Sequence, residues 1–343
     1  MSARGRLAAL AALLLCGPAA ARAASSAPVS VLLVGWDGCD RKHVLRLLQE
    51  GKLPRLASLA AQGSLVATEV TTGHTQTKPG WAEILTGYAA TRTGVLSNSD
   101  YKPIPKGWTI FERLKERFGP SFATIMISGK GGNVGTRGPH EIVVNAPHRD
   151  PITHKPTGYL DRDSFDGETL DGKPPVWAKR EGEPFHNAVG SWDVQELSAG
   201  RAPRVERRAE KAFDGLDGRR FFAFVHFADP DENGHLHGEG SPEYDRAIMA
   251  ADHWTGALLD HLAELGVSSR TVVYLTTDHG MDVGGHQHDH APETFVAAGS
   301  GRKLRAGDRK DVTPTIYQEL GLPGAGAPWD PPLDGRSLLE AVP

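Results

Sequence analysis

The sequence predicts an α/β fold: a doubly wound, mostly parallel sheet with helices on both faces. The main observation is four short apolar runs that read as strands, at residues 29–36, 123–128, 221–228 and 271–277. None of them alternates between apolar and polar residues, which indicates strands that are covered on both faces. Helical patterns lie between the runs, and this order is typical of the crossover connections in a parallel sheet.

The helical patterns cover residues 42–51, 53–63, 109–119 and 241–266. The first two each end in Gly, which commonly stops a helix. The last is the clearest, because a capping Ser and a Pro open it and its leucines form one apolar stripe.

Between residues 129 and 200 this regular pattern fades. The segment is rich in Gly, Pro, Asp and His and has few apolar runs. Two segments that contain tryptophan, "KPPVW" and "GSWDV", indicate some packing, whereas the alternative is a disordered loop. We therefore expect one domain over residues 24–343, with 129–200 as a loop-rich insertion that forms a small cap over the active-site edge of the sheet.

The first 23 residues have the three parts of a secretory signal peptide. Arg4 and Arg6 form the charged start, Leu7–Leu15 the apolar core, and residues 21–23 an A-x-A cleavage site. The alternative for this segment is a buried helix. A membrane-spanning helix is not expected, because the apolar run is too short to cross a bilayer, which takes ~20 residues. The sequence thus predicts export to the periplasm or the medium without stable membrane insertion.

Cleavage would leave Cys39 as the single cysteine, so no internal disulfide is expected.

The composition limits the class of partner. Hydrophobic residues make up 39% of the 343 residues, which is ordinary for a globular chain, and the 40 Gly and 24 Pro indicate many loops. The formal net charge of −4 argues against the basic surface of a nucleic-acid-binding protein. We therefore expect a small molecule as the partner.

Side chains that bind metals follow three of the predicted strands. Ligands bind beyond the carboxyl ends of strands in open α/β sheets, so these positions meet at one edge. The segments are "WDGCD", "DPDENGHLHG" and "DHGMDVGGHQHDH". Their candidates are Asp37, Asp40, Asp229, Asp231, His235, His237, Asp278, His279, His286, His288 and His290. Neutral imidazole and carboxylate together suit a divalent transition metal, so the sequence predicts a metal centre at this edge.

The segment "TTGHTQTKPGWAEILTGY" contains the candidate nucleophile. Residues 80–86 are expected to form a short helix, with Pro79 in its first turn. Thr77 would then lie at the helix N-terminus, where free N–H groups and the dipole favour anions. Its hydroxyl, next to a divalent cation, can ionise and attack phosphorus. The alternative is that Thr77 only caps the helix.

Together these motifs resemble the alkaline phosphatase superfamily, especially its type I phosphodiesterase/nucleotide pyrophosphatase branch. The resemblance is carried by "DG" after the first strand, Thr-x-Pro before "ILTGY", "PDENGH", "TTDHGM" and the tail "DVTPTIYQELGLP". It covers about residues 29–130 and 215–340. The resemblance implies an alkaline phosphatase-like sheet and a metal-dependent hydrolase of phosphate esters.

The resemblance also implies a cofactor: two divalent metal ions, usually zinc, although sites of His and Asp bind manganese as well. The residues implied around the first ion are Asp37, Thr77, Asp278 and His279. Those implied around the second are Asp231, His235 and one later histidine. In "HQHDHAPETF", the spacing of His288 fits best, with His286 and His290 as alternatives.

The implied mechanism starts with attack of Thr77 on phosphorus to form a phospho-threonine, assisted by the first ion. The second ion would stabilise the leaving oxygen and then activate the water that releases phosphate.

The sequence also departs from the patterns of the neighbouring branches. Sulfatases need Cys or Ser followed by x-Pro-x-Arg, whereas this chain has "TKPGW" from Thr77. Gly80 stands where the diesterase branch often has Asn.

Lys78 could neutralise a phosphate oxygen or lie in solvent, and Trp81 is expected to pack in the core. Lys130, in "SGKGGNVG", is left outside the predicted site because a glycine-flanked lysine is a weak signal alone.

Three functions are compatible with these residues. The preferred one is an exported two-metal phosphohydrolase that cleaves a small phosphate ester, with a diester favoured over a monoester. The second is a phosphotransferase, similar to phosphoethanolamine transferases, which passes the phosphoryl group to an alcohol. The third is a non-catalytic metal-binding protein with a degenerate site, which is disfavoured because every expected ligand and the nucleophile are present.

Overall fold

The computed structural model describes residues 29–149, 156–161, 174–325 and 328–340. The predicted signal peptide, residues 1–23, lies outside the described residues. Within the described part, none of the helices has the length and apolarity that a bilayer crossing requires.

An eight-stranded sheet forms the centre of the fold, in the order β11-β2-β10-β9-β1-β8-β3-β7. Its strands are β1 (Ser30–Trp36), β2 (Ser64–Glu69), β3 (Phe122–Ser128), β7 (Val194–Glu196), β8 (Arg220–Phe227), β9 (Thr271–Thr276), β10 (Glu293–Ala298) and β11 (Gly307–Asp308). β1 pairs in parallel with β8 and β9, and β3 pairs in parallel with β8. β10 runs antiparallel to β9 and β2. The predicted fold class, a mostly parallel sheet, is confirmed.

The four strands that the sequence predicts are β1, β3, β8 and β9, each within one residue of its expected bounds. They are the central strands, and almost every residue in them is buried. β2 and β10 pair with each other beside β9, and each has only a short apolar run next to polar residues, LVA in β2 and FVAA in β10. A mixed composition is the reason that apolar runs alone do not predict them.

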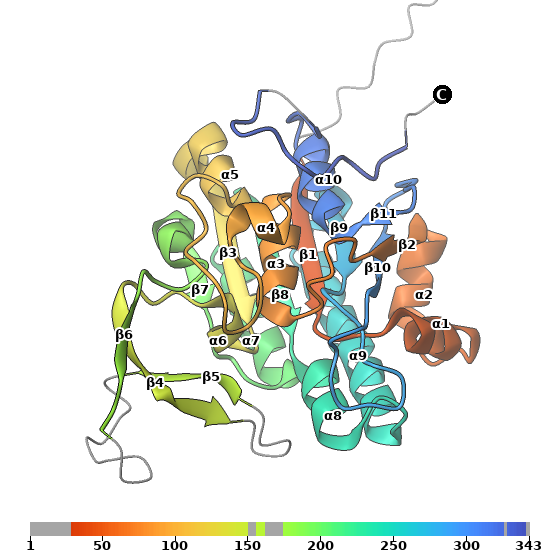
Figure 1. Ribbon diagram of the computed structural model, residues 1–343. Helices are drawn as coiled ribbons and strands as arrows, with labels where there is room; N and C mark the ends of the chain where they lie inside the picture. Colours follow the sequence, from red (N-terminus) through yellow and green to blue (C-terminus); the bar gives the residue numbers. More distant parts are fainter. Residues whose placement is uncertain (1–28, 150–155, 162–173, 326–327, 341–343) are drawn as a thin grey trace, which may run out of the picture.

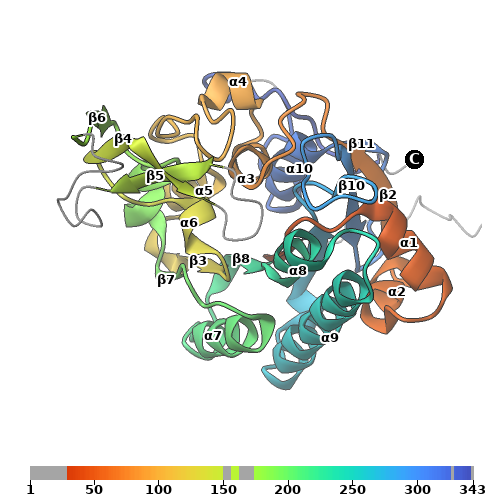
Figure 2. The ribbon, with the colours of Figure 1, turned by 60° about the horizontal axis from the view of Figure 1, so that its bottom comes forward.

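Helices cover both faces of the sheet (Figure 2). They are α1 (Arg41–Gln49), α2 (Pro54–Ala61), α3 (Thr77–Thr86), α4 (Ala90–Thr93), α5 (Ile110–Phe118), α6 (Gly131–Val134), α7 (Ala202–Asp214), α8 (Asp229–His237), α9 (Pro242–Glu264) and α10 (Val312–Glu319), with the 3-10 turns η1 (Gly119–Ser121), η3 (His186–Ser191), η4 (Ser268–Arg270) and η5 (Arg309–Asp311). In β1, Leu32 and Val34 pack with α1, α2, α7 and α9, whereas Val31 and Leu33 pack with α3, α5 and α10. This alternation is the period of two of a strand, so the sheet has a hydrophobic core on each side.

Residues 129–200 contain more regular structure than the sequence indicates. An antiparallel sheet in the order β5-β4-β6 is formed by β4 (His140–Arg149), β5 (Pro156–Asp161) and β6 (Trp177–Arg180). Figure 1 shows it at the lower left, beyond α6 and β7. Of the two tryptophans expected to pack, Trp192 is buried in a core and Trp177 is 38% exposed. The role of this segment as a cap stays a prediction.

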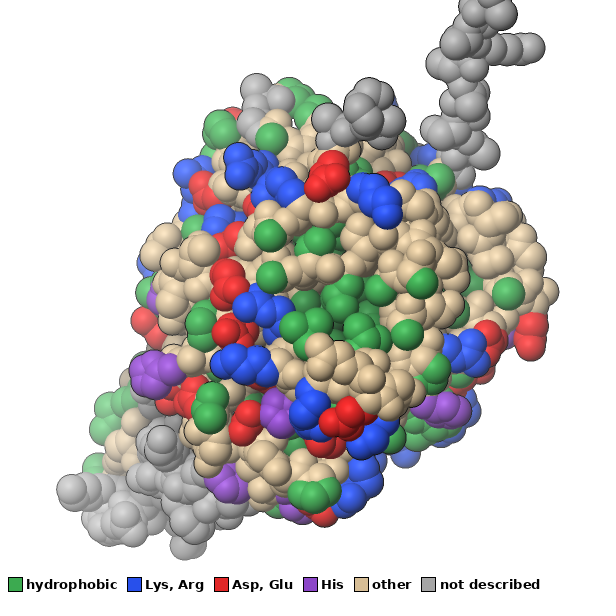
Figure 3. Space-filling view, turned by 90° about the vertical axis from the view of Figure 1, so that its right-hand side faces the viewer, with side chains coloured by type: hydrophobic (Ala, Val, Ile, Leu, Met, Phe, Trp, Pro, Cys, Tyr) green, Lys and Arg blue, Asp and Glu red, His purple; other side chains and the backbone are tan. Residues whose placement is uncertain are grey.

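One face of the molecule, that of α1 and α2, is shown in Figure 3. Lysine and arginine side chains are interspersed there with aspartate and glutamate, and no large area of one sign is visible on it.

Candidate metal centre

The predicted ligands lie at the carboxyl ends of three adjacent parallel strands. Asp37 follows β1, Asp231 lies in the first turn of α8 directly after β8, and Asp278 and His279 follow β9. Because these strands are neighbours in the sheet, the loops meet at one edge, and all four side chains are fully buried there. Figure 2 shows α3, α6 and α8 around this edge.

The first ligand group consists of Asp37, Asp278 and His279, whose candidate ligand atoms lie within 4.8 Å of one another. His279 Nε2 is 3.6 Å from Asp37 Oδ1 and 3.4 Å from Asp278 Oδ2. The backbone carbonyl of Gly280 accepts a hydrogen bond of 2.8 Å from Nδ1 of His279. Nε2 therefore directs its lone pair into the group, where Thr77 Oγ1 lies 3.2 Å away.

The second ligand group consists of Asp231, His235 and His288, again within 4.8 Å. Asp231 and His235 are four residues apart on α8, so they share a helix face, with 3.3 Å between Oδ1 and Nε2. His288 Nε2 is 3.9 Å from the same oxygen. The carbonyl of His286 accepts a hydrogen bond of 2.6 Å from His235 Nδ1, which points the opposite ring nitrogen at Asp231.

Of the three histidines in "HQHDH", the structure brings only His288 into the ligand group. His288 is 5% exposed, and its ring centroid is 4.0 Å from that of His279, so the two groups adjoin. The side chains of His286 and His290 are exposed. His286 donates from Nδ1 to the backbone carbonyl of His235, which joins its loop to α8.

Other acidic candidates have structural roles. Asp40 caps α1 by accepting a hydrogen bond from the Lys42 amide. Asp229 accepts one from the Ala202 amide at the start of α7. His237 ends α8 and is exposed. Acids are common at loop starts because they cap helices, so the strand-end pattern alone did not separate these from the ligand groups, whereas the ligand sets implied by the resemblance left them out.

The buried carboxylates fit a cation. Asp37 Oδ1, Asp231 Oδ1 and Asp278 Oδ2 are buried and have no hydrogen-bond partner within the described part of the chain. A buried carboxylate oxygen without a partner is costly, and a divalent ion would satisfy each of the three. The donor set, oxygen and imidazole nitrogen, suits zinc or a similar ion.

The pKa shifts of the residues in the two ligand groups also fit a bound cation. Burial raises the pKa of Asp278 well above its usual range, and the nearby Asp37 carboxylate adds to this rise. Burial lowers the pKa of His288 to about 3, so this ring is neutral. For His235 burial acts downward, but the Asp231 carboxylate outweighs it and raises the pKa to about 9. An ion bound at His235 at neutral pH must therefore displace a proton.

Thr77 is the first residue of α3, and Gln76 is the N-cap, with no hydrogen bond from its side chain to the helix. The expected helix thus begins earlier than Gly80, and the Thr77 hydroxyl contacts His279 instead of capping. A Cβ at Gly80 would lie 2.6 Å from Asp278 Cβ and 3.2 Å from a guanidinium nitrogen of Arg309. The close packing of α3 on the loop after β9 therefore leaves no room at this position for Asn. Trp81 is fully buried in the core.

Two residues of the site were missed by the sequence analysis. Lys130 Nζ forms an ion pair with Asp231 and lies 4.0 Å from Asp37 Oδ2. His226 donates from Nε2 to Asp37 Oδ2 over 2.9 Å and accepts from Ser128 Oγ over 3.1 Å. The signals were present: Lys130 follows β3 at the same sheet edge, and His226 interrupts the apolar run of β8.

Comparison with known proteins gives a match over most of the chain. The family model for type I phosphodiesterase / nucleotide pyrophosphatase matches residues 31–299. Ectonucleotide pyrophosphatase/phosphodiesterase family member 1 of Rattus norvegicus is 26% identical over 161 residues, which is 42% of this chain and 17% of that protein. Bis(5'-adenosyl)-triphosphatase ENPP4 of Homo sapiens is 24% identical over 263 residues, 75% of this chain and 48% of that protein. The matches thus span less than half the length of these relatives.

Among solved structures, a 2-O GAG sulfatase has a TM-score of 0.55 at 14% identity, with 92% of this chain and 76% of that chain covered. A protein solved with its substrate D-glucosamine-2-N,6-O-disulfate has a TM-score of 0.56 at 13% identity, with 91% and 80% covered. At these identities the likeness shows a shared fold.

Proposed function

Since the chain belongs to the type I phosphodiesterase/nucleotide pyrophosphatase family of the alkaline phosphatase superfamily, whose members are metal-dependent hydrolytic enzymes, we propose that it hydrolyses small phosphate esters, with diesters favoured. One observation carries this proposal: two adjoining groups of buried metal ligands lie beside the hydroxyl of Thr77. A degenerate site would lack at least one of these parts.

We propose that the two ligand groups hold two divalent ions, preferably zinc. The proposed ligands are Asp37, Thr77, Asp278 and His279 for one ion, and Asp231, His235 and His288 for the other. When bound, such ions polarise a phosphoryl group and lower the pKa of a coordinated hydroxyl or water.

Thr77 is the proposed nucleophile. Its Oγ1 forms a bond to phosphorus while the ester P–O bond breaks, so the leaving alcohol departs with the electron pair of that bond and takes up a proton. The product on the enzyme is phospho-threonine. His279 Nε2 lies 3.2 Å from Oγ1, so the hydroxyl at the helix N-terminus lies beside the first ligand group.

Water completes the reaction. Its oxygen bonds to phosphorus, the bond from phosphorus to Thr77 Oγ1 breaks, and the threonine oxygen regains a proton. The sum is one ester bond and one water consumed, with one alcohol and one phosphate product released. Burial of the ligand groups excludes other water from the phospho-threonine.

We further propose that the protein is exported, because the first 23 residues have the parts of a signal peptide. The proposed domain is the remaining chain, 24–343, and the proposed partner is a small phosphate ester.

The test combines metal content with turnover. The chain from residue 24 is purified, its metals are counted by elemental analysis, and bis-p-nitrophenyl phosphate is compared with p-nitrophenyl phosphate. We expect about two ions per chain and faster turnover of the diester. Thr77→Ala should lower kcat by about a thousandfold or more with most metal retained, whereas Thr91→Ala, at an exposed position, serves as the control. A chain with no stoichiometric metal and no turnover of either ester would refute the enzyme function.

A further inference from the structure

Lys78 is a buried cation that the proposed mechanism does not use. It follows Thr77 in the first turn of α3 and is only 7% exposed. Its Nζ donates to the carbonyl of Gly132 over 2.8 Å, and within the described residues it forms no ion pair with a carboxylate. Burying a lysine without a counter-charge is costly, so such residues are rare outside functional sites.

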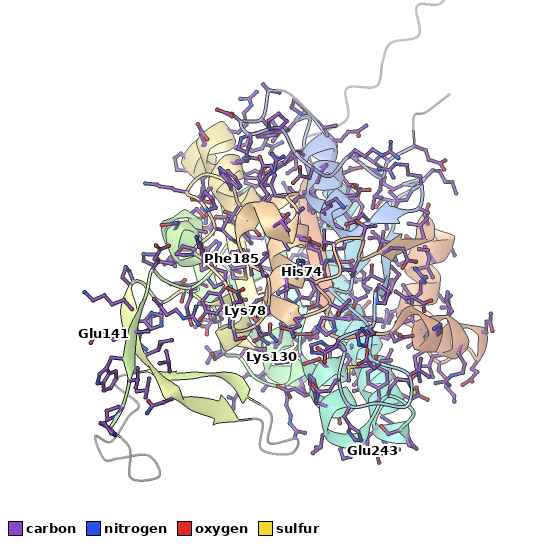
Figure 4. The ribbon with its side chains drawn as sticks, in the orientation of Figure 1. His74, Lys78, Lys130, Glu141, Phe185 and Glu243 are labelled. Atoms are coloured by element: carbon purple, nitrogen blue, oxygen red, sulfur yellow. The ribbon has the colours of Figure 1, made fainter. Side chains whose placement is uncertain are left out.

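Other cations surround Lys78. Its Nζ lies 4.9 Å from the ring centroid of Tyr101, and the guanidinium carbon of Arg180 lies 5.2 Å from the same centroid. Lys130 follows β3 and is the N-cap of α6, the helix whose Gly132 accepts the hydrogen bond from Lys78, and Figure 4 labels both lysines. Burial lowers the pKa of Lys78 to about 8, and Lys130 and Arg180 act in the same direction, against an opposing effect of Glu183.

The lysine side chains near Thr77 differ in their contacts with carboxylates. Lys130 has Asp231 and Asp37 as counter-charges, and Glu183 accepts a hydrogen bond from the backbone amide of Arg137. Among the described residues no carboxylate contacts Lys78, whose positive charge lies next to the nucleophile. An anion brought by a substrate would supply the missing counter-charge and form charge-assisted hydrogen bonds.

We propose that Lys78, with Arg180 near the same Tyr101 ring, binds a second anionic group of the substrate, a carboxylate, phosphate or sulfate close to the scissile phosphoryl group. This inference rests on the proposed function and narrows its substrate class to esters with an additional negative charge. Lys78 is the specificity-determining residue in this proposal.

A purely structural role for Lys78 gives a different expectation. Its hydrogen bond to Gly132 joins α3 to α6, and loss of that bond would affect all esters alike. Only a role in substrate recognition changes the ratio between a charged ester and an uncharged one.

The test therefore measures ratios of kcat/KM between isosteric esters. One pair is carboxymethyl and carbamoylmethyl p-nitrophenyl phosphate, which differ only by the charge on the retained group. A second pair, 3-carboxy- and 3-carbamoyl-4-nitrophenyl methyl phosphate, places the charge on the leaving group. We expect the wild-type protein to prefer the charged member of at least one pair by about tenfold to a hundredfold, the range for hydrogen bonds to charged groups.

The variants separate the possible outcomes. Lys78→Met should bring the ratio close to one, and Lys78→Arg should keep most of it. Lys52→Met removes the same charge from an exposed position and should leave the ratio as in the wild type. A wild-type ratio near one in both pairs, or a ratio that Lys78→Met does not change, overturns this inference while the ester hydrolysis itself stands. Turnover of none of the four esters overturns the proposed function, and this inference with it.

Discussion

His288 and His290 are two residues apart in one loop, yet their side chains have different surroundings. His288 is buried in a ligand group with Asp231 and His235, and His290 is exposed. Spacing from the "AP" dipeptide favoured His288, but only the folded loop places its ring beside that of His279. The same holds for Lys130, whose ion pair with Asp231 depends on a partner 101 residues away in the chain.

We predict that His288→Ala loses about one metal equivalent per chain, because a three-residue site that is left with two ligands binds far more weakly. His290→Ala should keep the full metal content. The measurement is elemental analysis after dialysis against metal-free buffer, and circular dichroism establishes that both variants are folded. Metal loss in His290→Ala with retention in His288→Ala would contradict this ligand set.

At the scale of elements, α3 is held in place by a buried ion pair. Arg309, in η5, donates from Nε to Glu83 Oε2 of α3 over 2.6 Å, and both side chains are fully buried. The same guanidinium donates to the carbonyls of Asp278 and His74 over 2.6 Å each. One arginine thus joins α3, the loop after β9 and the segment before α3, and these segments carry Thr77, Asp278 and His279.

We predict that Glu83→Gln lowers the free energy of unfolding by about 3–5 kcal/mol, because it leaves the Arg309 charge buried without its partner. Asp260→Asn breaks an exposed pair with Arg55 and should cost no more than about 1 kcal/mol. Urea unfolding measures both. A loss in Glu83→Gln as small as that in Asp260→Asn would show that the pair does not stabilise α3.

At the scale of the whole molecule, three buried carboxylates converge from Asp37, Asp231 and Asp278, and Lys130 pairs with Asp231 and lies 4.0 Å from Asp37. Their mutual repulsion opposes folding, and bound cations would relieve it. The stability of the entire fold is therefore expected to depend on the metal.

We predict that zinc at about a hundredfold excess over its Kd stabilises the metal-free protein by about 3 kcal/mol for each of the two proposed ions, about 5 kcal/mol in all, and raises its Tm by about 8 °C. Asp278→Asn should raise the Tm of the metal-free protein, because it removes one of the repelling carboxylates, and should reduce the response to zinc. Differential scanning calorimetry with and without a chelator checks this, and a single transition would agree with one domain over residues 24–343. An identical Tm with and without zinc would refute the coupling between metal binding and stability.

The sequence by itself determined the fold class, the four central strands and the type of side chain that follows each of them. These features depend on local composition and on the rule that parallel strands end at one edge, so a single sequence is sufficient to read them. The tertiary structure decided which acids are caps and which belong to the ligand groups, that His288 lies among the ligands, and that Lys78, Lys130 and His226 surround them. These assignments depend on distances between segments far apart in the chain, and such distances are fixed by strand register and by the packing of helices on the sheet, which no local pattern encodes.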